Sequence, residues 1–372
     1  MEIFKDLRIE INKEAIVIES KKEFKILSSA PINGGLKFSN KIVNLHIPLE
    51  FYKNPFEFLK IKENEIKDVV CLMTGADVSK ASIVEACTSN LKILVIATAG
   101  TSNATSITDG GQMEFLGTIN IIVIVNRSMT ESCMVNAIAT ITEAKCKALA
   151  SLDLRSKISK EQATGTSSDA IVIASLNEGT PLEYAGSATE LGWLIATSVE
   201  KAVRDAIISH DGILPNRPLL KRLEERGIFL EDLISTAMEM YVSHPSFSKE
   251  KAKEIFEKIL IETMNDINVA SLIMAALRIN EDGKKGLIPN LSAEDFEKDI
   301  VNLVADEILG ISISMYIAGY NGLFEFYRFD RNKPGILKKL PPFIDDAIGS
   351  LLAGVSSKMY SYMLKGNKNE NI

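Results

Sequence analysis

The sequence has few of the residues on which zinc enzymes and histidine-based hydrolases depend. Its 372 residues include only three histidines and four cysteines. The cysteines form no CxxC pair, and the histidines lack the i, i+4 spacing of a zinc-binding helix. Zinc sites and Ser-His-Asp triads therefore lack ligands or a base. Because no signal peptide is recognisable, we expect reduced thiols in a cytoplasmic protein.

Several classes of ligand are also disfavoured. The formal net charge is -7, so no broad basic surface is expected and nucleic acid is not a predicted partner. Neither GxxxxGK[ST] nor GxGxxG occurs. The longest uncharged stretch runs from Ile308 to Phe324 and is shorter than the ~20 residues of a membrane-spanning helix. We therefore expect no stable membrane insertion.

The N-terminal half alternates strand-like and helix-like segments. Short runs rich in Val and Ile predict buried strands at 69–73, 93–97, 119–125 and 171–174. Helical patterns occupy about 79–88, 131–152 and 188–209. Further strand-like segments at 15–19, 24–28 and 42–47 precede any clear helix. The sequence therefore predicts an α/β domain with a mixed sheet.

The C-terminal part has no strand-like runs after a segment rich in Gly and Pro at 212–218. The chain exceeds the size at which single cores stop growing, about 250–300 residues. We therefore predict two domains, 1–212 and 213–372, of which the second is all-α. Its helices are expected at 218–226, 230–241, 249–279, 293–320 and 344–365.

One predicted C-terminal helix carries polar residues on one face. Asp299, Asn302 and Asp306 lie at i, i+3 and i+7 among apolar neighbours, which at 100° per residue places them together. Asp345 and Asp346 begin another apolar helix. Buried carboxylates are costly unless they are paired or bind a metal. A solvated stripe and a helix cap remain the alternatives.

A cationic connector separates these two helices. It contains Arg328, Asp330, Arg331 and Lys333. Guanidinium groups bind phosphate oxygens through paired hydrogen bonds. All-oxygen ligands, with histidine scarce, favour Mg²⁺ or Mn²⁺ over zinc. These features together predict a metal-dependent phosphomonoesterase site.

Three segments of this region resemble the phosphatidylglycerophosphatase A superfamily, which is helical and metal-dependent: 304–310, 324–336 and 341–354. Residues 264–272 and the Lys-Pro-Gly loop make it similar to the α-ribazole phosphate phosphatase branch. The resemblance implies Asp306, Glu307 and Asp346 as metal or water-orienting acids. It implies Arg328, Asp330 and Lys333 around the phosphate. Asp266, Asp299 and Asp345 are weaker candidates.

Loops rich in small polar residues follow the predicted N-terminal strands, at 28–35, 98–104 and 164–169. In α/β domains ligands gather where such loops leave the strands. Ordinary turns have the same composition, so the loops alone leave both interpretations open.

Six segments in order nevertheless resemble the adenosylcobinamide amidohydrolase family: 28–35, 99–104, 117–123, 143–145, 163–174 and 184–192. The resemblance implies hydrolysis of the amide that joins the corrin ring to aminopropanol, giving adenosylcobyric acid. Thr105-Ser106-Ile107 stands where the family usually has a more charged loop. No cofactor is implied for this domain.

Amide hydrolysis needs a base, a nucleophile or water, and a donor to the oxyanion. Asp169 is the candidate base, and Thr164 and Thr166 are candidate nucleophiles or oxyanion donors. The candidate substrate-binding residues are Thr101, Asn103, Asn120 and Lys145. A surface position in a helix is the alternative for Lys145.

The two resemblances together are similar to a bifunctional archaeal hydrolase of cobalamin assembly and salvage. The expected partners are therefore small molecules, adenosylcobinamide and α-ribazole 5'-phosphate; a homo-oligomer is compatible with the sequence. The competing hypothesis is a lipid phosphatase fused to a non-catalytic corrinoid-binding domain.

Overall fold

The computed structural model describes residues 4, 6–51, 54–62, 66, 68–110, 117–243 and 247–369. The chain divides into two compact units, Met1–Asn216 and Arg217–Ile372. Each unit is described by itself. The assignment of one activity to 1–212 and another to 213–372 stays a prediction.

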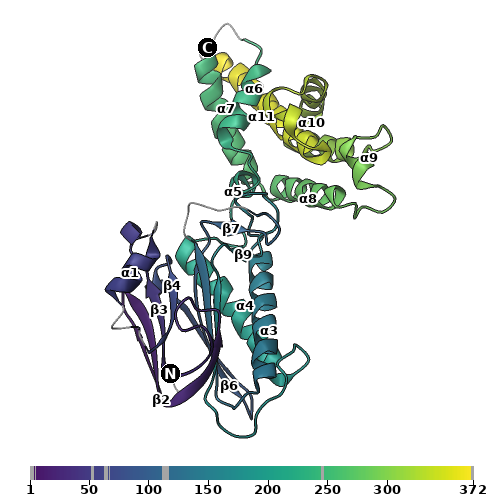
Figure 1. Ribbon diagram of the computed structural model, residues 1–372. Helices are drawn as coiled ribbons and strands as arrows, with labels where there is room; N and C mark the ends of the chain where they lie inside the picture. The colour runs from purple at the N-terminus through teal and green to yellow at the C-terminus, as the bar shows by residue number, and fades with distance from the viewer. Residues whose placement is uncertain are drawn as a thin grey trace. The chain divides into compact units, whose positions relative to one another are not determined.

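The first unit is built on a mixed β-sheet flanked by helices (Figure 1). Its strands are β1 (Leu7–Ile11), β2 (Ala15–Ser28), β3 (Gly35–His46), β4 (Val70–Thr74), β5 (Ser82–Cys87), β6 (Lys92–Gly100), β7 (Ala104–Thr105), β8 (Thr118–Val125), β9 (Gly165–Thr166) and β10 (Ala170–Ser175). Its helices are α1 (Pro55–Ile61), α3 (Glu131–Ser151) and α4 (Glu190–Asp211).

Eight of the described strands form one sheet in the order β4-β3-β2-β10-β8-β6-β5, with β1 also paired to β2. β3 runs parallel to β4, and β8 runs parallel to β10. The other pairs in this sheet are antiparallel. β7 and β9 form a separate two-stranded ribbon. The predicted α/β fold with a mixed sheet is confirmed.

The sheet is strongly curled. In a flat sheet β4 and β8, four places apart in the order, would lie roughly 19 Å from each other. Instead the Asn120 side chain on β8 donates to the Met73 carbonyl on β4 at 2.8 Å. Polar side chains thus meet across the concave face near the ends of β4 and β6.

Both faces of the sheet are buried. The concave face holds an apolar cluster that includes Ile18, Phe24, Leu72 and Ile122. The convex face packs against α3 and α4 over β6, β8 and β10, and against α1 over β3 and β4. Burial on both faces explains why β8 reads as a continuous apolar run.

Capping residues set the ends of the two long helices. Thr130 accepts a hydrogen bond from the Cys133 amide at the start of α3, and Thr189 accepts one from the Gly192 amide at the start of α4. Gly212 ends α4 in the left-handed conformation, with φ 69°. These local signals lie close to the predicted helix bounds.

The helix predicted at 79–88 is wrong, because most of this segment, Ser82–Cys87, forms β5. Ile83 and Val84 pair with β6 in antiparallel register. β-branched residues suit this pleated position, and pairing with the exposed edge of β6 outweighs the local helical pattern.

The second unit is helical, as predicted (Figure 1). Its helices are α5 (Leu219–Glu224), α6 (Leu230–Glu239), α7 (Lys249–Met264), α8 (Ile267–Lys284), α9 (Ala293–Glu297), α10 (Ala305–Asn332) and α11 (Pro342–Asn369). Buried side chains of α11, among them Ile348 and Leu352, join one apolar core with residues of the other six helices.

Three details of the predicted helical pattern are wrong. The helix expected at 293–320 is divided into α9 and α10, and Asp299 between them has a positive φ of 49°. The helix expected at 249–279 breaks before Asp266, which caps α8. The expected connector at 328–333 is mostly the last turns of α10, which ends at Asn332.

Small residues let α10 and α11 approach closely. α10 is broken at Ala318 and Gly319. A Cβ atom added at Gly354 of α11 would lie 2.7 Å from Cβ of Ile317 on α10. A Cβ added at Gly310 of α10 would lie 3.3 Å from the backbone oxygen of Asp346 on α11. This close approach places the starts of the two helices beside each other.

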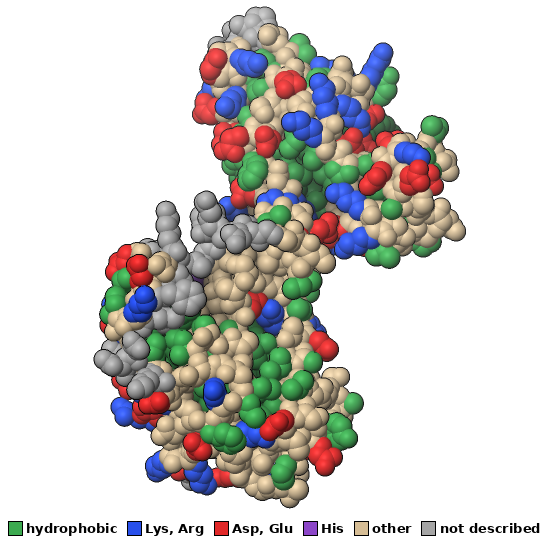
Figure 2. All heavy atoms as spheres, viewed as in Figure 1, with side chains coloured by type: hydrophobic (Ala, Val, Ile, Leu, Met, Phe, Trp, Pro, Cys, Tyr) green, Lys and Arg blue, Asp and Glu red, His purple; other side chains and the backbone are tan. Residues whose placement is uncertain are grey.

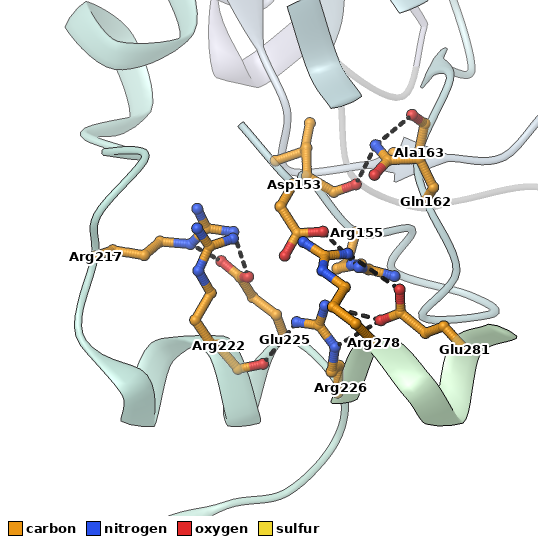
Figure 3. A network of polar contacts seen from close by, with 11 residues as sticks. Asp153, Arg155, Gln162, Ala163, Arg217, Arg222, Glu225, Arg226, Arg278 and Glu281 are labelled. Atoms are coloured by element: carbon orange, nitrogen blue, oxygen red, sulfur yellow. Dashed lines mark hydrogen bonds and ion pairs between the residues drawn. The ribbon is translucent and has the colours of Figure 1, made fainter. Parts of the chain in front are cut away.

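Ion pairs fix α5 within the helical unit (Figure 3). Arg217 binds both carboxylate oxygens of Glu225, at 2.6 and 2.5 Å. Arg226 binds Glu281 of α8 at 2.9 Å, and Arg278 binds the other oxygen of Glu281. Paired Arg-carboxylate contacts of this kind hold geometry well.

Acidic and basic side chains are interspersed on the face of this unit seen in Figure 2. In the described part of the chain, no single helix is long and apolar enough to cross a membrane. The pair α7 and α8 passes the same test only together, and it is bent by 81°.

Gly354→Ala should destabilise the protein by about 1–3 kcal/mol, because the new methyl group would overlap Ile317. Gly349→Ala on the same helix is the control: its Cβ would meet Leu337 at an ordinary 3.4 Å, so helix propensity should leave stability equal or up to ~1 kcal/mol higher. Urea unfolding followed by circular dichroism measures both. Equal effects of the two substitutions would contradict the close packing.

Candidate functional site

A buried ion pair lies at the edge of the sheet in the first unit. The carboxylate of Asp169, just before β10, contacts the Lys145 ammonium of α3. Both side chains are about nine-tenths buried, 10% and 11% exposed. The Thr166 hydroxyl donates to Asp169 Oδ1 at 2.5 Å. Lys145 is therefore not the surface helix residue considered as an alternative.

Backbone groups complete the surroundings of Asp169. The amide of Thr166 donates at 3.1 Å to Oδ2, and the amide of Ile119 donates at 3.1 Å to Oδ1. With Lys145 and the Thr166 hydroxyl, these donors occupy the usual accepting directions of a carboxylate. Gly165 leaves room for the group, since a Cβ there would overlap Asp169 and Lys145.

Asn103 lies in the neighbouring loop. Its Nδ2 donates to the Ser167 hydroxyl at 2.7 Å. Its side chain is fully buried, and its Oδ1 has no hydrogen-bond partner among the described residues. Asn103 thus adjoins the loop that carries Thr166 and Asp169.

A polar ladder crosses the concave face of the sheet beside this group. Asn120 donates to Asn44 Oδ1 at 2.8 Å, and Asn44 donates to Thr98 at 2.9 Å. Asn120 is paired in register with Ala170, next to Asp169. Sequence reasoning missed Asn44 and named Thr98 only as part of the loop at 98–104; the signal for Asn44 was an amide within the strand-like run at 42–47.

Thr101 and Thr164 are engaged elsewhere. Thr101 donates to Asp211 through both its amide and its hydroxyl, at 2.8 and 2.5 Å, and His210 contacts the other oxygen of Asp211. The Thr164 hydroxyl accepts from the Ile107 amide at 2.9 Å. The role of Thr101 in binding substrate and the role of Thr164 as a nucleophile or oxyanion donor both stay predictions.

A cavity of about 270 Å³ opens beside Asp169. It is lined by Ser29, Pro31, Ile47, Met73, Thr74, Gly75, Thr118, Ser168, Asp169 and Ala170. Its walls are the ends of β2, β3 and β4 and the starts of β8 and β10. The ion pair and this cavity form the candidate active site of the first unit.

A second group of charged residues lies at the start of α10 and α11 in the helical unit. One carboxylate oxygen each from Asp306, Glu307 and Asp346 can be chosen so that all three lie within 4.8 Å of one another. Asp306 and Asp346 are 2% and 4% exposed. These are the acids that the phosphatase resemblance implied, and the structure brings them together.

Burial raises the pKa values of these carboxyl groups. The pKa of Asp306 rises to about 7, mainly through burial and then through Glu307. The pKa of Asp346 rises to about 8, through burial and then the charge of Asp345. Burial also raises the pKa of Asp345, to about 6, although Lys333 opposes the shift.

Lys333 supplies a positive charge to the group. Its Nζ lies 2.6 Å from Asp345, 2.7 Å from Asp330 and 3.5 Å from Asp346. Burial opposes its charge, but Asp330 and Asp345 raise its pKa above the usual value. Lys333 ends α10 with a positive φ of 41°, a conformation that favours glycine. The ion pairs explain why a lysine occupies this position.

Other predicted members of this site are placed differently. Arg328 pairs with Glu325 at 2.7 Å and donates to the Met240 carbonyl, so its guanidinium is not bound to the acids. Asp266 caps α8 by accepting from the Asn268 and Val269 amides. Asp299 lies before the start of α10 and so does not share a face with Asp306. Its pKa is raised, first by burial and second by the charge of Glu307.

The acids fit a divalent cation. Glu307 Oε2 is buried without a hydrogen-bond partner among the described residues. Among the described residues, Lys333 is shared by Asp330, Asp345 and Asp346, so its single charge does not neutralise the group. An uncompensated buried charge is costly. The donors are all oxygen, which suits Mg²⁺ or Mn²⁺.

A carboxyl whose pKa is raised on folding stabilises the protein below the ordinary pKa of about 4 and loses this contribution as the pH rises through the folded value. For Asp346 that window ends near pH 8. In chelator, Asp346→Asn should therefore increase stability at pH 8, by on the order of 1–3 kcal/mol, and less at pH 5. With saturating Mg²⁺, wild type should instead be more stable than Asp346→Asn.

Glu254→Gln is the matched control, since its carboxylate is 71% exposed. Thermal unfolding of wild type and both variants at the two pH values, with chelator or Mg²⁺, provides the comparison. If Asp346→Asn changed stability by the same amount at both pH values and with or without Mg²⁺, the buried charge of these acids would not be destabilising.

Comparisons with known proteins give relatives for the first unit. Residues 1–215 match the family model of CbiZ, adenosylcobinamide amidohydrolase. An uncharacterized protein of Methanocaldococcus jannaschii is 31% identical over 229 residues, which cover 54% of this chain and 88% of the relative. A Methanosarcina mazei protein named adenosylcobinamide amidohydrolase is 28% identical over 213 residues, covering 53% of this chain and 96% of that protein.

A solved structure of a protein of unknown function from Bacillus stearothermophilus is 23% identical, with a TM-score of 0.34. The match covers 39% of this chain and 92% of the Bacillus stearothermophilus chain. At this TM-score the likeness carries no argument about function. The family match, in contrast, spans the curled sheet, the ion pair and the cavity. Through residues 1–215 the chain belongs to the adenosylcobinamide amidohydrolase family of hydrolases.

Proposed function

We propose that the first unit hydrolyses the amide between the corrin ring and aminopropanol in adenosylcobinamide, and that the helical unit is a metal-dependent phosphatase for α-ribazole 5'-phosphate. The observation that supports the first activity is the Thr166 hydroxyl directed at buried Asp169, beside a cavity. The observation that supports the second is the convergence of Asp306, Glu307 and Asp346.

Thr166 is the nucleophile of the proposed amide hydrolysis. Asp169 accepts hydrogen bonds from the Thr166 hydroxyl, Lys145 and two backbone amides. Of these donors, the Thr166 hydroxyl is the one that can act as a nucleophile, so its proton is the one that Asp169 removes. The Thr166 oxygen bonds to the amide carbon while Asp169 takes the proton. The carbon–nitrogen bond breaks, and the amine leaves with that proton. Water then cleaves the ester, releasing adenosylcobyric acid and restoring the hydroxyl.

Lys145 positions the base. Its ammonium contacts the carboxylate of Asp169 and fixes the orientation of that carboxylate. Asn103 is a candidate to orient the substrate amide, since its buried Oδ1 is a free acceptor among the described residues. Asn120 belongs to the ladder that supports the wall of the cavity.

Asp169→Asn should lower the rate of aminopropanol release by about 10²–10⁴-fold, because the base is lost. Thr166→Val should be equally inactive, whereas Thr166→Ser should retain part of the activity because it keeps the hydroxyl. Asp205→Asn, a partly exposed change on α4, is the control and should leave the rate unchanged. A Thr166→Val enzyme with native turnover would make water the direct nucleophile.

In the helical unit, Asp306, Glu307 and Asp346 would hold the divalent cation. A bound Mg²⁺ or Mn²⁺ supplies charge neutralisation at the phosphoryl oxygens and activation of water. Lys333 and Asp330 lie at the partly exposed side of the group, 35% and 36% exposed, where the phosphate can approach. Arg328 is positioned to reach the phosphate only after leaving Glu325.

Asp306→Asn should reduce phosphate release from α-ribazole 5'-phosphate by orders of magnitude, since the metal loses a ligand and the remaining acids repel one another. Lys333→Met should raise KM more than Arg328→Met does, because only Lys333 contacts the acids. Glu254→Gln is again the matched control. Phosphatase activity that survives Asp306→Asn, or is lost only with Arg328, would contradict this site.

A further inference from the structure

The cavity beside Asp169 is small for the proposed substrate. Its volume of about 270 Å³ lies below the roughly 300–1,000 Å³ of sites that enclose drug-sized ligands. A corrin ring with its adenosyl group is larger than such ligands. The cavity therefore has room for one arm of the substrate and not for the ring.

The lining of the cavity is divided by chemistry. Ile47, Met73 and Ala170 give it apolar walls, whereas Thr118 and Ser168 carry hydroxyl groups. A short amino alcohol has the same two parts, a hydrocarbon portion and one hydroxyl. Asp169 lies in the same wall, so an arm inside the cavity would end beside the proposed catalytic group.

The hydrogen bonds at Thr118 define what it offers a ligand. Ser168 donates its hydroxyl proton to the Gly117 carbonyl at 3.1 Å. In the 2.9 Å contact between the two hydroxyls, Thr118 must therefore be the donor. Its oxygen still has accepting capacity, because a hydroxyl has two lone pairs. Thr118 is 4% exposed, so a hydroxyl bound there would be shielded from water.

We infer that this cavity is the leaving-group subsite: it takes the aminopropanol arm, with Thr118 accepting a hydrogen bond from the arm's hydroxyl and Ala170 packing against its hydrocarbon part. The corrin ring stays outside. The inference rests on the proposed amide hydrolysis and adds which part of the substrate is enclosed and which residues select it.

Ala170→Val tests the size of the subsite, because it adds bulk at the wall and suits a strand. We expect kcat/KM for adenosylcobinamide to fall about tenfold or more, while the affinity for adenosylcobyric acid, which lacks the arm, stays within about twofold. Ala139→Val, an exposed change on α3, is the matched control. If Ala170→Val weakened the substrate and the product equally, the corrin ring would lie in the cavity. If it weakened neither, neither molecule would use the cavity.

Thr118→Val tests the hydroxyl contact without changing the size of the side chain. Wild type should prefer the aminopropanol amide over the corresponding propylamide, and Thr118→Val should abolish this preference, whereas Thr118→Ser should keep it. A preference that survives in Thr118→Val would overturn the role of Thr118.

If wild type hydrolyses no amide, the proposed function fails, but the subsite remains testable by binding alone. Equilibrium dialysis then compares adenosylcobinamide with adenosylcobyric acid. Ala170→Val should weaken only the first, and equal changes for both would overturn the inference.

Discussion

A buried carboxylate must be compensated by a cation or by hydrogen-bond donors, and this requirement organises both units of the chain. In the first unit the chain itself supplies the compensation: Asp169 is held by Lys145, two amides and the Thr166 hydroxyl. In the helical unit Asp306, Glu307 and Asp346 converge beside Lys333, and burial raises the pKa values of Asp306 and Asp346. The same physical cost thus underlies both proposals, the catalytic base in one unit and the cation site in the other.

Much of the fold could be predicted from the sequence, because burial leaves a clear pattern. Strands such as β8 are apolar throughout since both faces are covered, and α4 ends where Gly212 allows a left-handed turn. β5 could not be predicted locally, because its pairing with β6 decides its conformation. The break between α9 and α10 was also missed, since apolar spacing continues across Asp299 despite its positive φ.

Part of each candidate site could likewise be predicted from the sequence, and part could not. Asp306, Glu307 and Asp346 were implied together by the resemblance to a phosphatase family, and the structure brings their carboxylates close to one another. Arg328 and Lys333 were expected together on a connector, but α10 continues to Asn332, and five residues of helix turn side chains about 140° apart. The ladder of Asn44 and Thr98 depends on the curl of the sheet, which joins strands distant in its order. No spacing along the chain encodes that contact.

The central claim is that the two units perform separate chemistry with different sources of positive charge. It is tested most directly by following aminopropanol release and phosphate release in one preparation of the full chain, before and after chelation of divalent metals. The account predicts that chelation abolishes phosphate release, that Mg²⁺ or Mn²⁺ restores it, and that aminopropanol release is unchanged throughout. Loss of both activities on chelation, or full phosphate release without metal, would contradict it.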